Sequence, residues 1–206
     1  MKHMLAGVLA MAIIVMASNI LVQFLLGDWL TWGAITYPFA FLVTDLMNRF
    51  YGVRAARRVV LCGFVVGVVC SLIGSQIDGE FGPLVSMRVA IGSGTAFLVA
   101  QMMDVAIFDR LRQGRWWTAP LLSSLIGATL DTMLFFSIAF STQLSFLAPG
   151  EDVAWANEIV PLLGHGPQLP LWVSLAVADS SLKFGLSLLA LLPFRAVVTK
   201  LSPKYV

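Results

Sequence analysis

The chain has 206 residues, of which 59% are hydrophobic and 12% are charged, and its formal net charge is +2. Soluble globular proteins carry about 25% charged residues, so these charges are too few to cover a water-soluble body of this size. The composition therefore excludes a large soluble domain and predicts that lipid surrounds most of the chain.

Six long apolar segments follow one another. They run approximately from Met4 to Leu26, Leu30 to Asn48, Val59 to Ile77, Ser86 to Phe108, Ala119 to Leu147 and Leu169 to Phe194. Each can cross about 30 Å of hydrocarbon as a helix. A backbone in lipid must satisfy its own hydrogen bonds, which favours helices over open strands. We predict an all-α, polytopic membrane protein with six transmembrane helices in a single domain, residues 1–206.

The connections between the segments add detail. Lys2 precedes the first segment as in a signal peptide, but the uncharged stretch exceeds the roughly 7–15 residues of a signal core, so we interpret it as a retained span. Only Gly27–Trp29 separates the first two segments, which predicts a tight hairpin. The loop 148–168 is expected to be a structured external loop or to contain a short interfacial helix around Val153–Leu163.

The basic residues predict the orientation. Eleven of the thirteen fall on one predicted side, namely Lys2, Arg49, Arg54, Arg57, Arg58, Arg110, Arg112, Arg115, Arg195, Lys200 and Lys204. The opposite loops hold the acidic residues Asp28, Asp78, Glu80, Glu151, Asp152 and Glu158. Because cytoplasmic loops carry an excess of Lys and Arg, we expect both termini to be cytoplasmic.

Several reaction signatures are missing. The sequence has no phosphate-binding G-x-x-x-x-G-K-[ST] loop, no H-E-x-x-H and no G-x-S-x-G. Its two histidines, His3 and His165, are too few for a histidine-based metal site. We therefore expect no enzyme activity, no cofactor and no metal.

Polar side chains within the apolar segments are the candidate functional residues, because such groups are costly in lipid and usually face a cavity or a partner. They are Asn19, Gln23, Asp45, Arg88, Gln101, Asp104, Asp131, Asp179 and Lys183. Counting along each helix places Asp45 and Asp104 toward the cytoplasm. The mid-membrane group comprises Asn19, Gln101, Asp131, Asp179 and Lys183.

Some of these residues also have a purely structural interpretation. Asp179 and Lys183 are spaced i, i+4 and can neutralise each other. Asp45 and Asp104 can pair with nearby arginines, namely Arg49, Arg57 and Arg58. Arg88 can extend to the outer headgroups.

Asp131 is different. It lies in an otherwise uncharged run, and an unpaired carboxylate at that depth is unfavourable unless a cavity, a cation or a ligand meets it.

The polar residues belong to a longer pattern. Its first part comprises Ser18-Asn19, Val22-Gln23, Thr31-Trp32-Gly33-Ala34, Pro38-Phe39, Thr44-Asp45-Leu46, Gly52 and Ala56-Arg57-Arg58. Its second part comprises Arg88-Val89-Ala90, Ser93, Gln101, Asp104-Val105, Phe108, Arg110-Leu111-Arg112-Gln113, Trp116-Trp117 and Pro120. Its third part comprises Asp131-Thr132, Phe135-Phe136, Ile138-Ala139-Phe140, Asp179 and Lys183. The pattern resembles the queuosine precursor transporter family, also called the vitamin uptake transporter family, over nearly the whole chain apart from 148–168.

This resemblance implies a six-helix importer in the bacterial inner membrane, with no nucleic-acid partner. Its substrates would be the purine-like bases 7-cyano-7-deazaguanine and 7-aminomethyl-7-deazaguanine, salvaged to make queuosine in tRNA. It also implies a helical core similar to the substrate-binding subunits of energy-coupling-factor transporters.

A guanine-type edge offers two adjacent N–H donors and a keto acceptor, which a carboxylate and an amide or ammonium group can bind. We expect Asp131 to bind the N–H edge and Asn19 with Gln101 to complete the polar rim. Asp179 and Lys183 would gate the site or bind the ligand. Ring-stacking candidates are Phe135, Phe136 and Phe39, and gating or structural ion pairs would involve Asp45, Asp104 and Arg88.

Two rival interpretations stay open. One is a substrate-binding subunit that works only with a separate ATPase module, supported solely by Ala6-x-x-x-Ala10. The other is an intramembrane enzyme or assembly protein without transport. The small size of a six-helix body favours a homodimer.

Overall fold

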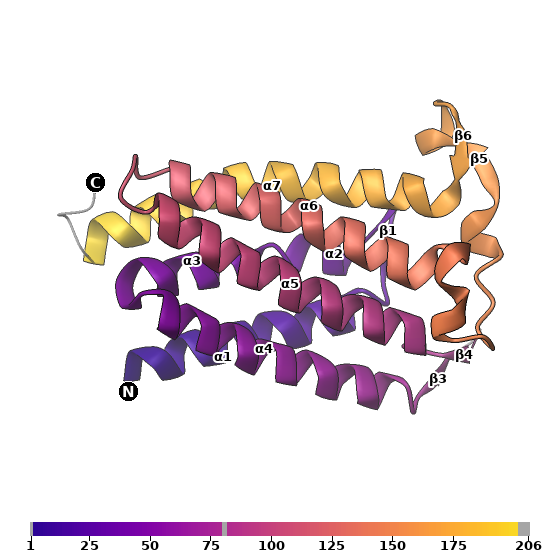
Figure 1. Cartoon of the computed structure of the whole chain (residues 1–206), viewed down its shortest axis with the longest axis horizontal. Coiled ribbons are helices and arrows are strands. Elements are labelled where there is room, and N and C mark those ends of the chain that lie inside the picture. The colour runs from indigo at the N-terminus through magenta and orange to yellow at the C-terminus, as the bar shows by residue number, and fades with distance from the viewer. Residues whose placement is uncertain (1, 80–81, 202–206) are drawn as a thin grey trace.

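Long helices lie side by side in the computed structural model, which describes residues 2–79 and 82–201 (Figure 1). They are α1 (Lys2–Leu21), α4 (Val53–Gly74), α5 (Met87–Leu111), α6 (Thr118–Phe140) and α7 (Leu171–Leu201). Within the described ranges, these five are long and apolar enough to cross a membrane. Many of their large apolar side chains are exposed, as expected for a surface that faces lipid.

The second predicted span is broken. It consists of α2 (Trp32–Thr36) and α3 (Phe39–Tyr51), with Tyr37 and Pro38 between them. Proline has no N–H to donate to the carbonyl four residues earlier and its ring clashes with the preceding turn, which accounts for the interruption. Neither piece is long enough to cross a bilayer alone, so the prediction of six continuous helices is wrong at this segment.

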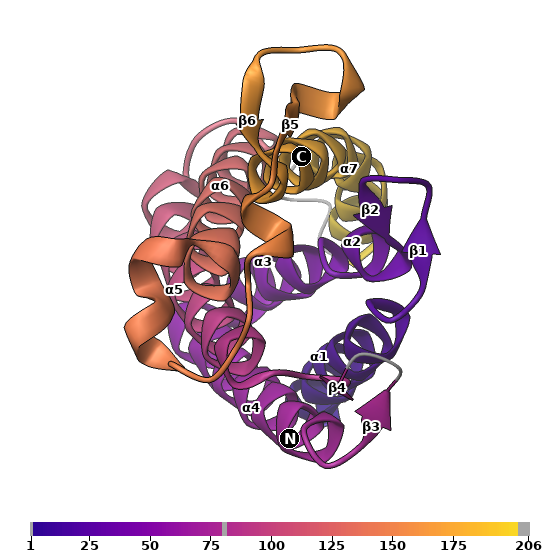
Figure 2. The same ribbon diagram turned by 90° about the vertical axis from the view of Figure 1, so that its right-hand side faces the viewer.

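α3 occupies the centre of the bundle. It contacts α1, α4, α5, α6 and α7, and Figure 2 shows it between α1 and α7 when the bundle is viewed from its end. The side chains of α3 can therefore contact the helices on either side of it, from α1 and α4 to α6 and α7.

The predicted tight connection after α1 is a hairpin. β1 (Leu25–Leu26) pairs antiparallel with β2 (Leu30–Thr31). Gly27 has a φ of 67°, a value that residues with a Cβ rarely adopt. The first helix ends at Leu21 rather than at Leu26, because Leu25 and Leu26 belong to this hairpin.

The other connections lie at the two ends of the bundle (Figure 1). The α3–α4 and α5–α6 turns lie at the end where the described chain starts and finishes, together with most of the basic residues. The hairpin of β3 (Asp78–Gly79) and β4 (Gly82–Pro83) and the segment 141–170 lie at the opposite end. Glu80 and Lys204, which contributed to the predicted charge asymmetry, are outside the described residues.

The loop 148–168 is structured but has no α-helix around Val153–Leu163. It contains the 3-10 turns η1 (Thr142–Leu147), η2 (Trp155–Asn157) and η3 (Leu162–Gly164), and β5 (Ile159–Pro161) pairs with β6 (Gln168–Pro170). The fifth predicted helix ends at Phe140 instead of Leu147, because Ser141 adopts an extended conformation with a ψ of 132°.

Glycines allow close packing at two helix contacts. A Cβ on Gly127 of α6 would lie 2.7 Å from the Phe41 ring, and one on Gly63 of α4 would lie 2.6 Å from the Met11 side chain. These glycines let neighbouring helices approach, as small residues do in membrane proteins. The contact of Gly127 with Phe41 holds α3 against α6, where the candidate site lies.

Candidate functional site

A buried polar cluster joins three parts of the fold. Asp131 and Thr132 come from α6, Asp179 and Lys183 come from α7, and Tyr37 comes from the break between α2 and α3. The two aspartates and the lysine are between 5% and 8% exposed. We call these five residues the Asp131 cluster.

Lys183 lies between the two carboxylates. Its Nζ is 2.6 Å from Asp179 Oδ2 and 2.7 Å from Asp131 Oδ2. The ion pair expected from the i, i+4 spacing of Asp179 and Lys183 is therefore present, but the lysine is shared with a second helix. The interpretation of Asp131 as an unpaired carboxylate is corrected, because it has a cation from α7.

Hydroxyl groups complete the cluster. Tyr37 donates to Asp131 Oδ1 at 2.8 Å, and Thr132 donates to Asp179 Oδ2 at 2.6 Å. Thr132 also accepts a hydrogen bond from Lys183 Nζ at 3.2 Å. With both aspartates ionised, two negative charges face one ammonium group. Buried charges need compensation, so the remaining negative charge favours a ligand that is rich in N–H donors or positively charged.

A cavity adjoins the cluster at Tyr37. It holds about 360 Å³ of empty space including its open mouth, and its lining includes Asn19, Tyr37, Phe64, Ser93 and Phe97. The Tyr37 and Phe97 rings meet edge to face with centroids 6.1 Å apart. Aromatic walls with a few polar groups are typical of sites for small planar ligands. We call this space the Tyr37 cavity.

Asn19 is the predicted site residue that lines this cavity, where its Nδ2 donates to Val15 O at 2.9 Å. Gln101 lies elsewhere, because its Oε1 accepts a hydrogen bond from Thr44 at 2.7 Å. Gln23 is exposed and its Nε2 lies 3.4 Å from Leu84 O.

None of the predicted stacking residues Phe39, Phe135 and Phe136 lines the Tyr37 cavity. The Phe39 side chain is 42% exposed, so it points away from the interior. Phe135 packs against Phe136 and Phe140, with ring centroids 5.1 and 5.9 Å apart. The rings that reach the cavity are Tyr37, Phe64 and Phe97 instead.

Arg88 neither extends to the headgroups nor forms a salt bridge within the described ranges. It is fully buried and donates to Ile138 O at 2.9 Å and to Ser141 O at 2.6 Å. The last carbonyls of a helix have no partner within it, so the guanidinium group caps the C-terminal end of α6. This correction gives Arg88 a structural role in ending that helix.

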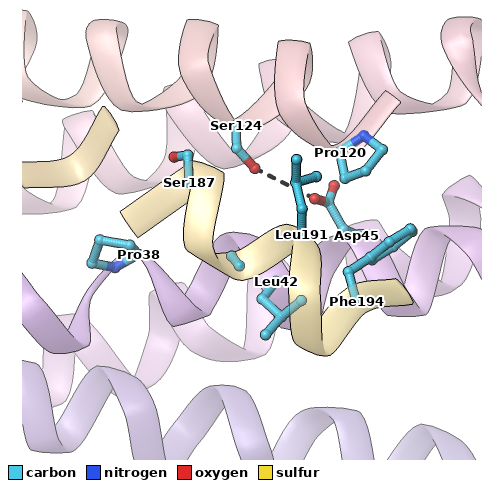
Figure 3. Close-up of a pocket in the computed structure, with 9 residues that line it drawn as sticks. Pro38, Leu42, Asp45, Pro120, Ser124, Ser187, Leu191 and Phe194 are labelled. Carbon is cyan, nitrogen blue, oxygen red and sulfur yellow. Dashed lines mark hydrogen bonds between the residues drawn. The ribbon is translucent and has the colours of Figure 1, made fainter. Parts of the chain in front are cut away.

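Asp45 and Asp104 do not pair with the predicted arginines. Asp45 accepts hydrogen bonds from Ser123 at 3.3 Å and Ser124 at 3.4 Å, and the latter contact is drawn in Figure 3. Arg49 donates to the carbonyl of Arg112 at 2.6 Å. The other two arginines of the prediction, Arg57 and Arg58, are on the exposed face of α4.

Sequence reasoning missed four functional candidates. Tyr37 had a signal, because a proline directly after it marks a break in a long apolar segment. Thr132 stood beside Asp131 in the family pattern but had no signal of its own. Ser123 and Ser124 had none, since hydroxyl residues are frequent in membrane helices and their partners come from other helices.

Comparisons with known proteins agree with the family resemblance found in the sequence. The profile of a family described as "Putative vitamin uptake transporter" matches residues 31–198. The "Queuosine precursor transporter" of Escherichia coli (strain K12) is 32% identical over 200 residues, which cover 90% of this chain and 81% of that protein. The "Probable queuosine precursor transporter" of Haemophilus influenzae is 39% identical over 121 residues, covering 53% and 52%. The protein of the same description from Bacillus subtilis (strain 168) is 25% identical over 199 residues, covering 87% and 76%. No solved structure matches the chain.

Proposed function

The chain belongs to the vitamin uptake transporter family, and from this premise we propose that it imports queuosine precursors across the bacterial inner membrane. The ligands are 7-cyano-7-deazaguanine and 7-aminomethyl-7-deazaguanine, which are salvaged for queuosine in tRNA. The observation that carries this proposal is the buried Asp131 cluster, in which two carboxyl groups share one ammonium group, beside the aromatic Tyr37 cavity.

The ligand chemistry fits the cluster in the following way. The adjacent N–H donors of the guanine-type edge bind the Asp131 carboxylate and take the place of the Tyr37 hydroxyl. Asn19 serves the keto oxygen, and the Tyr37 and Phe97 rings hold the planar base. Lys183 and Asp179 keep the carboxylate in place. A ligand with an ammonium group also balances the remaining negative charge of the cluster.

The proposed topology has six membrane passes. The broken pair α2–α3 forms the sixth, because α3 lies at the centre of the bundle and discontinuous helices are tolerated where they line a cavity. The end rich in arginine, where the described chain starts and finishes, faces the cytoplasm. We propose that this topology follows that of the substrate-binding subunits of energy-coupling-factor transporters and that two copies form a homodimer.

Transport by the isolated protein tests this function. Liposomes containing only this chain are loaded with unlabelled 7-cyano-7-deazaguanine, and entry of the labelled base is followed. We expect rapid exchange that unlabelled base outside the liposomes inhibits, while empty liposomes show none. Exchange that requires an added ATPase module would favour the binding-subunit alternative. Absence of both exchange and binding would contradict the proposed function.

A further inference from the structure

A second pair of carboxyl groups lies away from the Asp131 cluster. Asp45 on α3 is 2% exposed and Asp104 on α5 is fully buried. The Asp104 carboxyl lies beside the Asp45 carboxyl and the Ser123 hydroxyl, yet neither of its oxygens accepts a hydrogen bond. One turn earlier on α5, Gln101 Nε2 also lacks a partner. The structure thus leaves a buried carboxyl group beside a hydroxyl that does not form a well-aligned hydrogen bond with it.

The elements packed around this pair supply hydroxyls rather than cations. α6 contributes Ser123 and Ser124, α7 contributes Ser187, and α4 presents a buried apolar face of Ala56, Val59 and Val60.

The neighbouring cations on α3 and α7 have other partners. Arg49, one turn after Asp45, donates to the Arg112 carbonyl, and Lys183 binds Asp131 and Asp179. Among the salt bridges of residues 2–79 and 82–201, none includes Asp45 or Asp104.

Two ionised carboxylates side by side in a protein interior repel each other, and a single proton shared between them removes one charge. The same proton supplies the hydrogen-bond donor that the Asp104 oxygens lack. Resting on the proposed function, we propose that Asp45 and Asp104 form the proton-binding site that couples substrate entry to proton entry. One proton adds to a carboxylate of the pair from the outer side and leaves unchanged to the cytoplasm, and no other bond is made or broken.

The pair is connected to the substrate site. Figure 3 shows a cavity lined by Asp45, Ser124, Ser187 and Pro38, with about 260 Å³ of empty space including its mouth. Ser187 lies one turn after Lys183 and donates to its carbonyl. Pro38 directly follows Tyr37, and α3 leads from it to Asp45. A change in charge at the pair can therefore move α3. That movement would also displace Tyr37, whose hydroxyl donates to Asp131.

The test uses the whole chain in liposomes with 7-cyano-7-deazaguanine, a neutral base whose entry by itself brings no net charge and no acid into the liposome. An inward gradient of one pH unit supports an accumulation of about tenfold at one proton per ligand, and an internal pH dye should report acidification during uptake. The Asp104→Asn protein should keep exchange of labelled for unlabelled base but lose this accumulation. Asp109→Asn is the matched control, because this residue is on the same helix with its side chain 38% exposed. It should accumulate the base like wild type.

Other results would overturn the inference. Wild-type uptake with a flat dye signal, or accumulation driven by a sodium gradient alone, would exclude proton coupling while leaving the proposed function intact. Full accumulation of the base by the Asp104→Asn protein would show that the pair is not the proton-binding site. Asp45→Asn provides a second isosteric variant if Asp104→Asn does not fold. The dye measurement on the wild-type protein decides whether protons enter with the base, and it depends on neither variant. Absence of exchange in wild type would overturn the proposed function itself.

Discussion

Lys183 is the residue on which the charge balance of the interior depends. Its ammonium group lies within 2.7 Å of both Asp131 and Asp179 and 5.3 Å from the centre of the Tyr37 ring. Removing one member of a buried charge group leaves its partners uncompensated, which costs more than removing the whole group. The consequences differ for each of the three charged residues.

Substituting Lys183 should be the most damaging change, because two buried carboxylates lose their common cation. Lys183→Ala should destabilise the protein by about 3–5 kcal/mol, seen as a lower Tm in detergent. Adding Asp179→Asn should recover part of this loss, since one carboxylate then remains and Tyr37 binds it. Strictly additive effects of the two substitutions in a double-mutant cycle would show that these residues do not interact.

Asp131→Asn should behave in the opposite way. Asp179 still neutralises Lys183 in this variant, so the protein should insert and purify normally. The new amide places a donor against a ligand N–H, which costs about 1–3 kcal/mol, or roughly one to two decades in affinity for 7-deazaguanine bases. Calorimetry on the folded protein measures this effect.

The matched control for that measurement is Thr129→Ala, half a turn earlier on α6, because the Thr129 hydroxyl binds only its own helix at Leu125 O. It should bind the base like wild type. If the Asp131→Asn protein binds the base with wild-type affinity, Asp131 does not contact the substrate.

At the scale of elements, the contact between α3 and α6 positions the site. Gly127 makes this contact because its missing Cβ leaves room for the Phe41 ring. The break at Tyr37–Pro38 then directs the tyrosine hydroxyl toward Asp131 on the same helix as Gly127. A small shift of α3 should therefore disturb both stability and binding.

Gly127→Ala tests this packing. A Cβ there would lie 2.7 Å from the Phe41 ring and 3.4 Å from Ala100 O, and overpacking typically costs 1–3 kcal/mol. We expect a lower Tm and weaker binding. Gly185→Ala on α7 is the control, since a Cβ at that position meets nothing within 4 Å. It should leave the Tm unchanged or raise it, and an equal loss in both variants would contradict the packing argument.

At the scale of the whole molecule, the two ends of the bundle differ in charge. The described arginines of the helix ends and turns gather where the described chain starts and finishes, while Glu151, Asp152 and Glu158 lie in the loop at the other end (Figure 1). This asymmetry, acting through the membrane insertion machinery, is the basis for the proposed orientation.

Reporter fusions check the orientation. A reporter fused after residue 206 should be cytoplasmic, whereas one inserted near Asn157 should be outside. Gly150 offers a second insertion site in the same loop, because a side chain there would meet nothing within 4 Å. A cytoplasmic signal from the loop together with an external C-terminus would reject the proposed topology.

The sequence by itself determined the class of protein and the approximate position of most helix ends, because length, apolarity and charge placement act locally along the chain. The family came from the resemblance of its polar and aromatic residues to a known pattern, which the family profile then confirmed. The sequence also indicated which polar residues needed a partner. It placed the i, i+4 ion pair of Asp179 and Lys183, since that distance depends only on helix geometry.

The identity of those partner residues is determined only by the tertiary structure. Asp131 and Lys183 are 52 residues apart and Tyr37 and Asp131 are 94 apart, so their contacts depend on how each helix is rotated and at what depth it packs. The same is true of Asp45, which meets two serines of α6 instead of the arginines beside it in sequence. Periodicity describes one helix at a time, whereas side chains of several helices meet in the interior through the packing of the whole bundle.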